Sequence, residues 1–276
     1  MDKLLTVVIP SYNVEKFLNQ TLDSFVCDEA VMKKFEVIVV DDGSKDNTAK
    51  IGKEYADKYP DTFRVISKEN GGHGSTIHCR MRNAVGNYLK AVDGDDGVNA
   101  ADFVKLVEDL EKTESEYVFT NYNEYYDDVN RQKAVDFPQF KDGTEYDFAD
   151  VANKVYIPMH ALVIKTSVLK DNNIVIDEKC FYVDVEYVMF PVPFVNKVTF
   201  FDLHVYMYRL ALSTQSVSIL GFQKHINDHL RVTFHMFDFY RDYISSDKAD
   251  SAKADYMSTC IADLIITQSS IYSSYP

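Results

Sequence analysis

Short apolar runs alternate with helical stripes along the first hundred residues of the chain. The runs are continuous and rich in β-branched residues, which is typical of strands buried on both faces of a sheet. We predict strands at 4–10, 35–40, 63–66 and 88–92, and helices between them at 14–25, 51–59 and 76–85. Strands that alternate with helices favour an α/β fold with a mostly parallel central sheet flanked by helices.

Polar segments follow directly after these predicted strands. Ligands of parallel α/β sheets bind at the carboxyl ends of the strands. We therefore expect the polar segments to form one rim, although they are far apart in the sequence. They are 11–13, 41–44, 71–75 and 93–96.

The pattern weakens after the first hundred residues. A helix around 103–110 and a fifth strand at 116–120 continue the alternation, whereas residues 121–160 are rich in Tyr, Asp and Asn and have little periodicity. From Gly221 the chain is predicted to be largely helical. We expect one α/β domain with a helical C-terminal appendage.

Composition narrows the range of partners. The chain has 43 acidic against 29 basic residues and a net charge of -14, which disfavours nucleic acid as a partner. No apolar stretch approaches the ~20 residues of a membrane helix, and the apolar segment before Pro10 is too short for a signal peptide. The four cysteines are scattered without a C-x-x-C pair, which predicts reduced thiols. A soluble, cytoplasmic protein is expected, with peripheral contact at the inner face of the membrane left open.

An aromatic stripe in the C-terminal helical region has two interpretations. Phe234 and Phe237 lie on it, and the charged residues around them balance. A membrane-docking helix would carry an excess of Lys and Arg. A buried packing face is therefore the preferred interpretation.

The turn "DGDDG" crowds three aspartates, Asp93, Asp95 and Asp96, at the end of the fourth predicted strand. Like charges this close raise one another's pKa unless a cation lies between them, so the turn either faces water or holds a cation. Carboxylates one residue apart can share a hard divalent ion whose other positions are filled by water and substrate phosphates. A phosphatase of the D-x-D-G-[TV] type is excluded, because its nucleophile would fall on Gly94.

Three other signals are weaker when taken alone. "DDGS" at 41–44 is either a structural turn or a source of carboxylates for a ribose or base edge. "ENGGHGST" matches neither common phosphate-binding glycine pattern, so a plain flexible loop is expected. His225 and His229 stand four apart without an obvious third metal ligand, so a packed or solvated helix face is preferred.

The ordered segments "TVVIPSYN", "VIVVDDGSKDNT", "ENGGHGS" and "AVDGDDGV" closely resemble the nucleotide-sugar-binding half of family 2 glycosyltransferases, which have the GT-A fold. "FYVDVEYV", at 181–188, resembles the segment that carries the family's catalytic base, and "YRLALSTQSVS", at 208–218, resembles one that follows it. The resemblance implies a GT-A domain over 1–218, with a donor half (1–112) and an acceptor half (113–218), before a helical region at 219–276.

The resemblance also implies roles for individual residues. Pro10 and Tyr12 would border the nucleotide base, and Asp42, with Asp41 beside it, would contact the uracil or ribose. Asp93 and Asp95 would form the D-x-D motif, in which Asp95 binds Mn²⁺ or Mg²⁺ and Asp93 helps to hold the ribose or the metal shell. Asp96 would be structural, as the cap of the next helix.

Asp184 would be the catalytic base of an inverting transfer, although helix capping is the alternative structural role. Val183 stands where the family often has Glu, and the segment "CRMRNAVGN" replaces the commoner A-R-N, so Arg80 and Arg82 receive no role. The absence of a Q-x-x-R-W segment argues against a processive synthase.

The implied function is transfer of a sugar from a UDP-sugar or related donor to a hydroxyl of a glycan or lipid-linked acceptor in cell-surface polysaccharide synthesis. The resemblance specifies neither the sugar, the acceptor nor the oligomeric state. Two alternatives remain: a non-catalytic nucleotide-sugar-binding protein on the same fold, and a metal-dependent phosphatase or nucleotidyltransferase.

Overall fold

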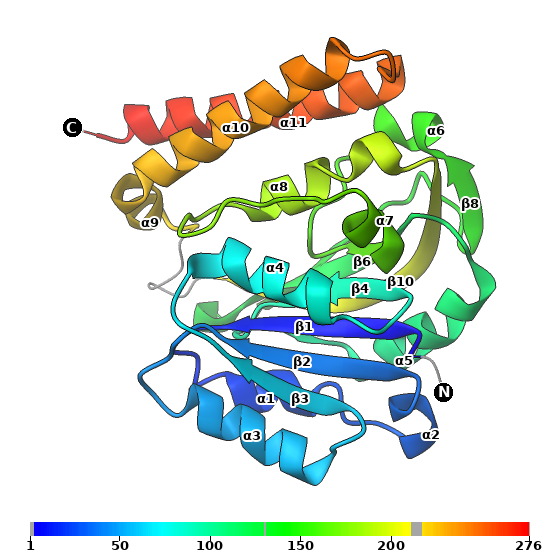
Figure 1. Cartoon of the computed structure of the whole chain (residues 1–276), viewed down its shortest axis with the longest axis vertical. Coiled ribbons are helices and arrows are strands. Elements are labelled where there is room, and N and C mark those ends of the chain that lie inside the picture. Colours follow the sequence, from blue (N-terminus) through cyan, green and yellow to red (C-terminus); the bar gives the residue numbers. More distant parts are fainter. Residues whose placement is uncertain (1–2, 130, 211–216, 276) are drawn as a thin grey trace.

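The computed structural model describes residues 3–129, 131–210 and 217–275, with the backbone alone at 78–82 and 128. Figure 1 shows a central sheet with helices on both sides and a further pair of helices, α10 and α11, stacked above one of these layers. The α/β fold with a helical C-terminal region is therefore confirmed.

The strands are β1 (Leu5–Ser11), β2 (Phe35–Asp41), β3 (Phe63–Ser67), β4 (Tyr88–Ala91), β5 (Gly97–Val98), β6 (Tyr117–Tyr126), β7 (Arg131–Val135), β8 (Thr144–Asp147), β9 (Leu162–Lys165) and β10 (Lys197–Leu210). The α-helices are α1 (Leu18–Asp23), α2 (Glu29–Met32), α3 (Thr48–Lys58), α4 (Gly72–Asn83), α5 (Ala100–Asp109), α6 (Phe148–Ala152), α7 (Thr166–Asp171), α8 (Asp184–Met189), α9 (Ile219–Lys224), α10 (Ile226–Ile244) and α11 (Ser251–Ser273). Short 3₁₀ turns occur at Leu110–Lys112, Asp127–Val129 and Val192–Phe194.

One sheet contains all of the described strands, in the order β3-β2-β1-β4-β9-β6-β10-β5, with β7 and β8 on its flanks. The pairs β1–β2, β2–β3, β1–β4 and β6–β10 are parallel. Strand β9 is antiparallel to both of its neighbours, β4 and β6. It therefore joins the four strands predicted from the first hundred residues to β6 and, beyond it, to β10 and β5.

Both faces of the sheet are buried, as the continuous apolar runs predict. Val7 and Val37 belong to a core on one face, whereas their neighbours Val8 and Ile38 belong to the core on the other face. Helices α1 and α5 cover the first face, and α4, α7 and α8 cover the second (Figure 1).

Helices α10 and α11 extend the second core rather than forming a separate one. Val232 and Met236 of α10 and Met257 of α11 are fully buried in it. The predicted aromatic packing face is only partly confirmed: Phe234 is 65% exposed and Phe237 is 49% exposed, whereas Tyr243 is buried in this core and Tyr240 packs against it. None of the described helices is long and apolar enough to cross a membrane.

Candidate active site

The carboxyl ends of β1, β2 and β4 meet at one edge of the sheet. Ser11 and Asp41 are paired across β1 and β2, and the backbone N–H of Asp42 donates to the Ser11 carbonyl at 2.9 Å. The N–H of Gly94, in the aspartate turn, donates to the Pro10 carbonyl at 3.1 Å. The expected rim is thereby confirmed for segments that lie about 30 and 80 residues apart in the sequence.

Asp96 holds the aspartate turn against strand β10. It is 4% exposed, and its carboxylate accepts hydrogen bonds from the Tyr206 hydroxyl at 2.6 Å and the Arg209 N–H at 2.7 Å. The same hydroxyl accepts the N–H of Asp93 at 3.2 Å. The structural role expected of Asp96 is confirmed, but not as a helix cap: Asn99 caps α5, because its side chain accepts the N–H groups of Ala101 and Asp102.

Asp93 and Asp95 remain at the open side of the turn. Burial, together with the charge of Asp93, raises the pKa of Asp95 to about 6, and the guanidinium of Arg209 opposes this rise. Asp95, with the Asp93 carboxylate beside it, is a suitable oxygen donor for a hard divalent cation, which would stabilise the ionised form of Asp95. The donor set therefore fits Mn²⁺ or Mg²⁺ with two protein ligands and the remainder from substrate and water.

Arg209 also holds this turn in place, although the sequence alone suggests no role for it. Its Nε donates to the carbonyl of Asp95 at 2.9 Å, and its other nitrogens bond Asp127 at 2.6 Å and Gln20 at 2.7 Å. Its guanidinium also lies over the ring of Phe17, 5.2 Å from the centroid. No local pattern could have identified it, because its partners come from three distant parts of the chain.

Asp42 organises the glycine segment that follows β3. Its carboxylate accepts the N–H groups of Gly71 at 2.9 Å and Gly72 at 2.8 Å, and the ammonium of Lys68 at 2.7 Å. The plain flexible loop expected here is wrong, because helix α4 begins at Gly72. A carboxylate at the first turn of a helix satisfies N–H groups that have no partner within the helix, which explains the early start.

The other residues expected to contact the nucleotide also lie at the rim. Tyr12 is 49% exposed just beyond β1, whereas Pro10 is buried within that strand. The Asp41 carboxylate accepts the N–H of Ser44 at 3.0 Å, which is the structural turn expected of "DDGS". The nucleotide contacts of these residues stay predictions.

Asp184 reaches the rim from the second half of the chain. It is the first residue of α8, where Val183 holds the cap position, and its carboxylate accepts the backbone N–H groups of Asp184 and Val185. Burial raises the pKa of Asp184, the charge of His73 lowers it, and that of Asp93 raises it again. His73 Nδ1 in turn lies 4.0 Å from Asp93 Oδ1. The proposed base, a histidine and the aspartate turn thus interact electrostatically at one place.

The glycines of the α4 segment allow it to dock against the chain that leads to Asp184. The carbonyl of Gly71 accepts the N–H of Lys179 at 2.6 Å. Gly72 has a φ of +78°, and a Cβ there would lie 3.0 Å from backbone atoms of Lys179. A Cβ on Gly74 would lie 1.8 Å from the carbonyl oxygen of Asp177. These glycines serve a close approach of two backbones.

The two histidines of "HINDH" have different surroundings. His229 is buried, and its Nδ1 lies 2.7 Å from the Gln268 side-chain oxygen. His225 lies beside Asp228, at 3.5 Å, and against the ring of Phe181. The packed interpretation is therefore confirmed for His229.

Two sequence features fall outside the described part of the structure. They are the side chains of Arg80 and Arg82, and residues 211–216 within the segment 208–218. The remaining part of that segment supplies Arg209.

Comparison with known proteins decides the family. The family model for glycosyl transferase family 2 matches residues 6–172, which is more than half of the chain. The chain belongs to glycosyl transferase family 2.

Relatives of this family member occur in several bacteria. The chain is 36% identical over 118 residues to the uncharacterized glycosyltransferase EpsJ of Bacillus subtilis, covering 43% of this chain and 33% of EpsJ. It is 32% identical over 111 residues to the minor teichoic acid biosynthesis protein GgaB of Bacillus subtilis, covering 40% of this chain and 12% of GgaB. The chain therefore matches a third or less of the length of these relatives.

Solved structures match over nearly the whole chain. The crystal structure of Staphylococcus aureus TarS 1–349 in complex with UDP-GlcNAc superposes with a TM-score of 0.69 at 19% identity, covering 95% of this chain and 71% of that one. The mannosyltransferase PcManGT from Pyrobaculum calidifontis, in complex with GDP-Man and Mn²⁺, superposes with a TM-score of 0.63 at 15% identity, covering 99% of this chain and 75% of that one. These likenesses confirm the expected GT-A-type fold.

Proposed function

We propose that the protein is an inverting, metal-dependent glycosyltransferase that moves a sugar from a nucleoside-diphosphate sugar to an acceptor hydroxyl. The observation that carries the proposal is the convergence of Asp184, His73 and Asp93 at the carboxyl edge of the sheet. A pair of carboxylates for a cation therefore lies close to a separate carboxylate for a proton.

Asp95, with Asp93 beside it, would hold the divalent metal. Mn²⁺ or Mg²⁺ held there would supply positive charge that stabilises the departing diphosphate. Tyr12 and Pro10 would border the base. The uracil or ribose would lie against the Asp41–Asp42 edge.

Asp184 would accept the proton of the acceptor hydroxyl. As the acceptor oxygen bonds to the anomeric carbon, the bond from that carbon to the diphosphate oxygen breaks, and the hydroxyl proton passes to the Asp184 carboxylate. A positioned base of this kind contributes ~10² to 10⁴ in rate. When protonated, His73 would favour the ionised form of Asp184 that the step requires.

The choice of donor and acceptor rests on relatives. TarS is a poly(ribitol-phosphate) β-N-acetylglucosaminyltransferase whose structure holds UDP-GlcNAc, GgaB is named for teichoic acid biosynthesis, and PcManGT holds GDP-Man and Mn²⁺. These names support a nucleotide-sugar donor such as a UDP-sugar and a glycan acceptor of the cell surface. A lipid-linked acceptor and action at the cytoplasmic side of the membrane belong to the proposal through the sequence resemblance alone. We further propose that 1–112 forms the donor half and 113–218 the acceptor half.

A panel of UDP- and GDP-sugars, assayed for donor hydrolysis and transfer with Mn²⁺ present, tests the proposal. We expect turnover of at least one donor, with release of nucleoside diphosphate rather than of phosphate or pyrophosphate. Asp184→Asn should bind UDP but lose turnover by ~10² or more. Asp171→Asn, which changes an exposed carboxylate on α7, is the matched control and should retain turnover. Full activity of Asp184→Asn would contradict the assignment of the base.

A further inference from the structure

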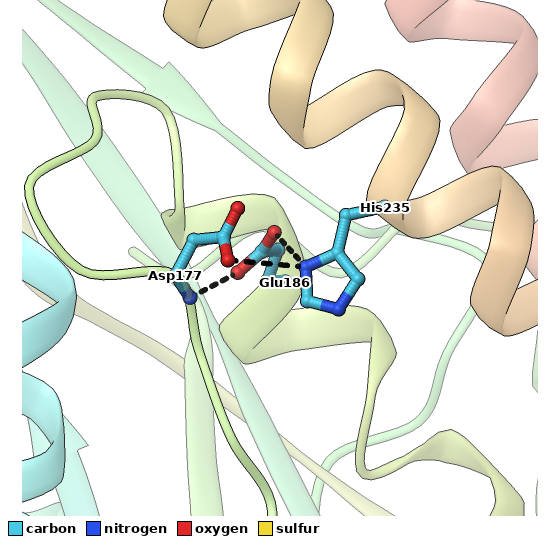
Figure 2. A group of neighbouring side chains, drawn as sticks. All are labelled: Asp177, Glu186 and His235. Carbon is cyan, nitrogen blue, oxygen red and sulfur yellow. Dashed lines mark hydrogen bonds and ion pairs between the residues drawn. The ribbon is translucent and has the colours of Figure 1, made fainter.

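A second cluster of charged side chains lies behind the proposed base. Glu186 stands two residues after Asp184 on α8 and is fully buried. Figure 2 shows it between Asp177, which precedes α8, and His235 of helix α10. Burying a carboxylate destabilises the folded protein unless both of its oxygens accept hydrogen bonds. The partners of Glu186 therefore show which elements this residue holds together.

Both oxygens of Glu186 have partners from different elements. Oε2 accepts the backbone N–H of Asp177 at 2.8 Å, and Oε1 lies 2.9 Å from His235 Nδ1 (Figure 2). The hydrogen bond to Glu186 raises the pKa of His235, which favours the imidazolium form. Glu186 therefore joins three parts of the chain: the segment before α8, α8 itself and the C-terminal helix α10.

Helix α10 makes a second contact with the segment before α8, through Arg231, one helical turn before His235. Arg231 Nε lies 2.9 Å from Asp177 Oδ2, and His235 Nδ1 lies 3.5 Å from Asp177 Oδ1. Arg231 and His235 are four residues apart and so lie on the same face of the helix. Arg231 and His235 of α10 thus face the two carboxylates of Asp177 and Glu186.

The other side of Asp177 touches the active site. Its carbonyl oxygen is the atom that a side chain on Gly74 would strike, and the neighbouring Lys179 N–H is bonded to Gly71. The segment 177–183 is consequently held between α4, which carries His73, and α10. Any displacement of Asp177 or Glu186 would displace the start of α8, where Asp184 lies.

We infer that Glu186 and His235 are positioning residues for the transfer reaction, holding α8 so that Asp184 faces His73 and the aspartate turn. The inference rests on the proposed role of Asp184 as the base. It also assigns a function to the C-terminal helices, because α10 supplies His235 and Arg231 from outside the region 6–172 that the family model matches.

Asp177, Glu186 and His235 have potential metal-ligand atoms within 4.8 Å of one another, which is also compatible with a metal site. The ion-pair account is favoured because Glu186 Oε2 already accepts the Asp177 N–H. In addition, the guanidinium of Arg231 contacts Asp177, and a cation there would repel a divalent metal. A metal site is thus an alternative that the experiment must be able to detect.

Steady-state kinetics of His235→Ala, His235→Asn and Glu186→Gln test the inference. A displacement of the base by about 1 Å can cost up to ~10²-fold in rate, so we expect kcat to fall at least about tenfold in His235→Ala. The donor KM and the UDP affinity should stay within about twofold, because the donor-binding edge of the sheet is not touched.

Asparagine can place an N–H close to the position of His235 Nδ1, so His235→Asn should recover a large part of kcat. Glu186→Gln keeps a hydrogen-bond acceptor for the Asp177 N–H, so its kcat should fall less than that of His235→Ala.

Arg241→Gln is the matched control, because it removes exposed ion pairs within α10 that do not reach α8. Its kcat should equal that of the wild type. Thermal unfolding confirms that each variant is folded, and only folded variants are compared.

The outcomes separate this inference from the proposed function. Full turnover by Asp184→Asn would remove the proposed base and the inference with it. An inactive Asp184→Asn together with wild-type kcat in His235→Ala would overturn the inference alone. In an Asp95→Asn background, a rise in Tm caused by Zn²⁺ or Mn²⁺ and lost in His235→Ala would overturn the ion-pair account and establish a metal site.

Discussion

Gly74 lies so close to Asp177 that a Cβ on the glycine would stand 1.8 Å from the aspartate carbonyl oxygen. Two segments about a hundred residues apart in the sequence therefore touch backbone to backbone. One begins helix α4 and carries His73, and the other leads into helix α8 and Asp184. The relative position of the histidine and the proposed base depends on this contact.

Gly74→Ala should separate these two segments. We expect a loss of stability of about 1–3 kcal/mol, the usual cost of overpacking, and a fall in kcat larger than any change in donor KM. Chemical denaturation and steady-state kinetics measure the two effects. In the control, Gly97→Ala, the new Cβ would make only an ordinary contact at 3.5 Å with Ser24 Oγ. Equal effects of the two substitutions would argue against a special role for the Gly74 contact.

Lys90 should make the stability of the protein depend on pH. It is fully buried, its ammonium lies 2.8 Å from the carbonyl of His160, and burial lowers its pKa to about 7 from 10.5. Between these pKa values the unfolded chain binds a proton that the folded chain does not. The free energy of unfolding should therefore rise with pH in this window, by up to about 1.4 kcal/mol per pH unit.

Lys90→Met should remove this contribution. Urea denaturation between about pH 7.5 and 9 measures the slope, which we expect to be flatter in the variant than in the wild type. Lys50→Met, at a position where the side chain is 73% exposed, is the control and should leave the slope unchanged. An identical slope in wild type and Lys90→Met would mean that Lys90 stays protonated over this range.

Tyr206→Phe should destabilise the aspartate turn. The substitution removes the hydroxyl that donates to the buried Asp96 carboxylate and accepts the Asp93 N–H. Loss of one partner of a buried group costs about 1–3 kcal/mol, and we expect a weaker affinity for Mn²⁺ as well. Tyr208→Phe, two residues along β10, removes a hydroxyl without a hydrogen bond to these aspartates and should change both quantities less. Denaturation and metal titration compare the two, and a neutral Tyr206→Phe would contradict the anchoring role.

The sequence predicts the fold of the first hundred residues well, because its signals are local. Continuous apolar runs mark β1 to β4, and the rule that strands present ligand-binding residues at their carboxyl ends brings Ser11, Asp41 and Gly94 to one edge. Apolar periodicity and turn chemistry depend on neighbours in the chain, so a single sequence is sufficient to read them.

The features that sequence reasoning missed are set by distant contacts. Arg209 gains its role from Gln20, Asp95 and Asp127, and Asp42 starts helix α4 from 30 residues away. Aromatic residues on α10 predicted the packing face only in part, since Phe234 and Phe237 are exposed and the buried face is formed by residues such as Val232, Met236 and Tyr243. Hydrophobicity alone does not tell which side of a helix another element will cover.

In the proposed function, Asp95 binds a divalent metal that joins the nucleotide to the protein. Calorimetric titration of UDP, in Mn²⁺ and again in EDTA, tests it on the wild type and on Asp95→Asn. We expect UDP to bind the wild type in Mn²⁺, with a loss of about tenfold or more in affinity both in EDTA and in Asp95→Asn, as removal of a charged contact implies. Equal UDP affinity with and without Mn²⁺, or no UDP binding at all, would contradict the account.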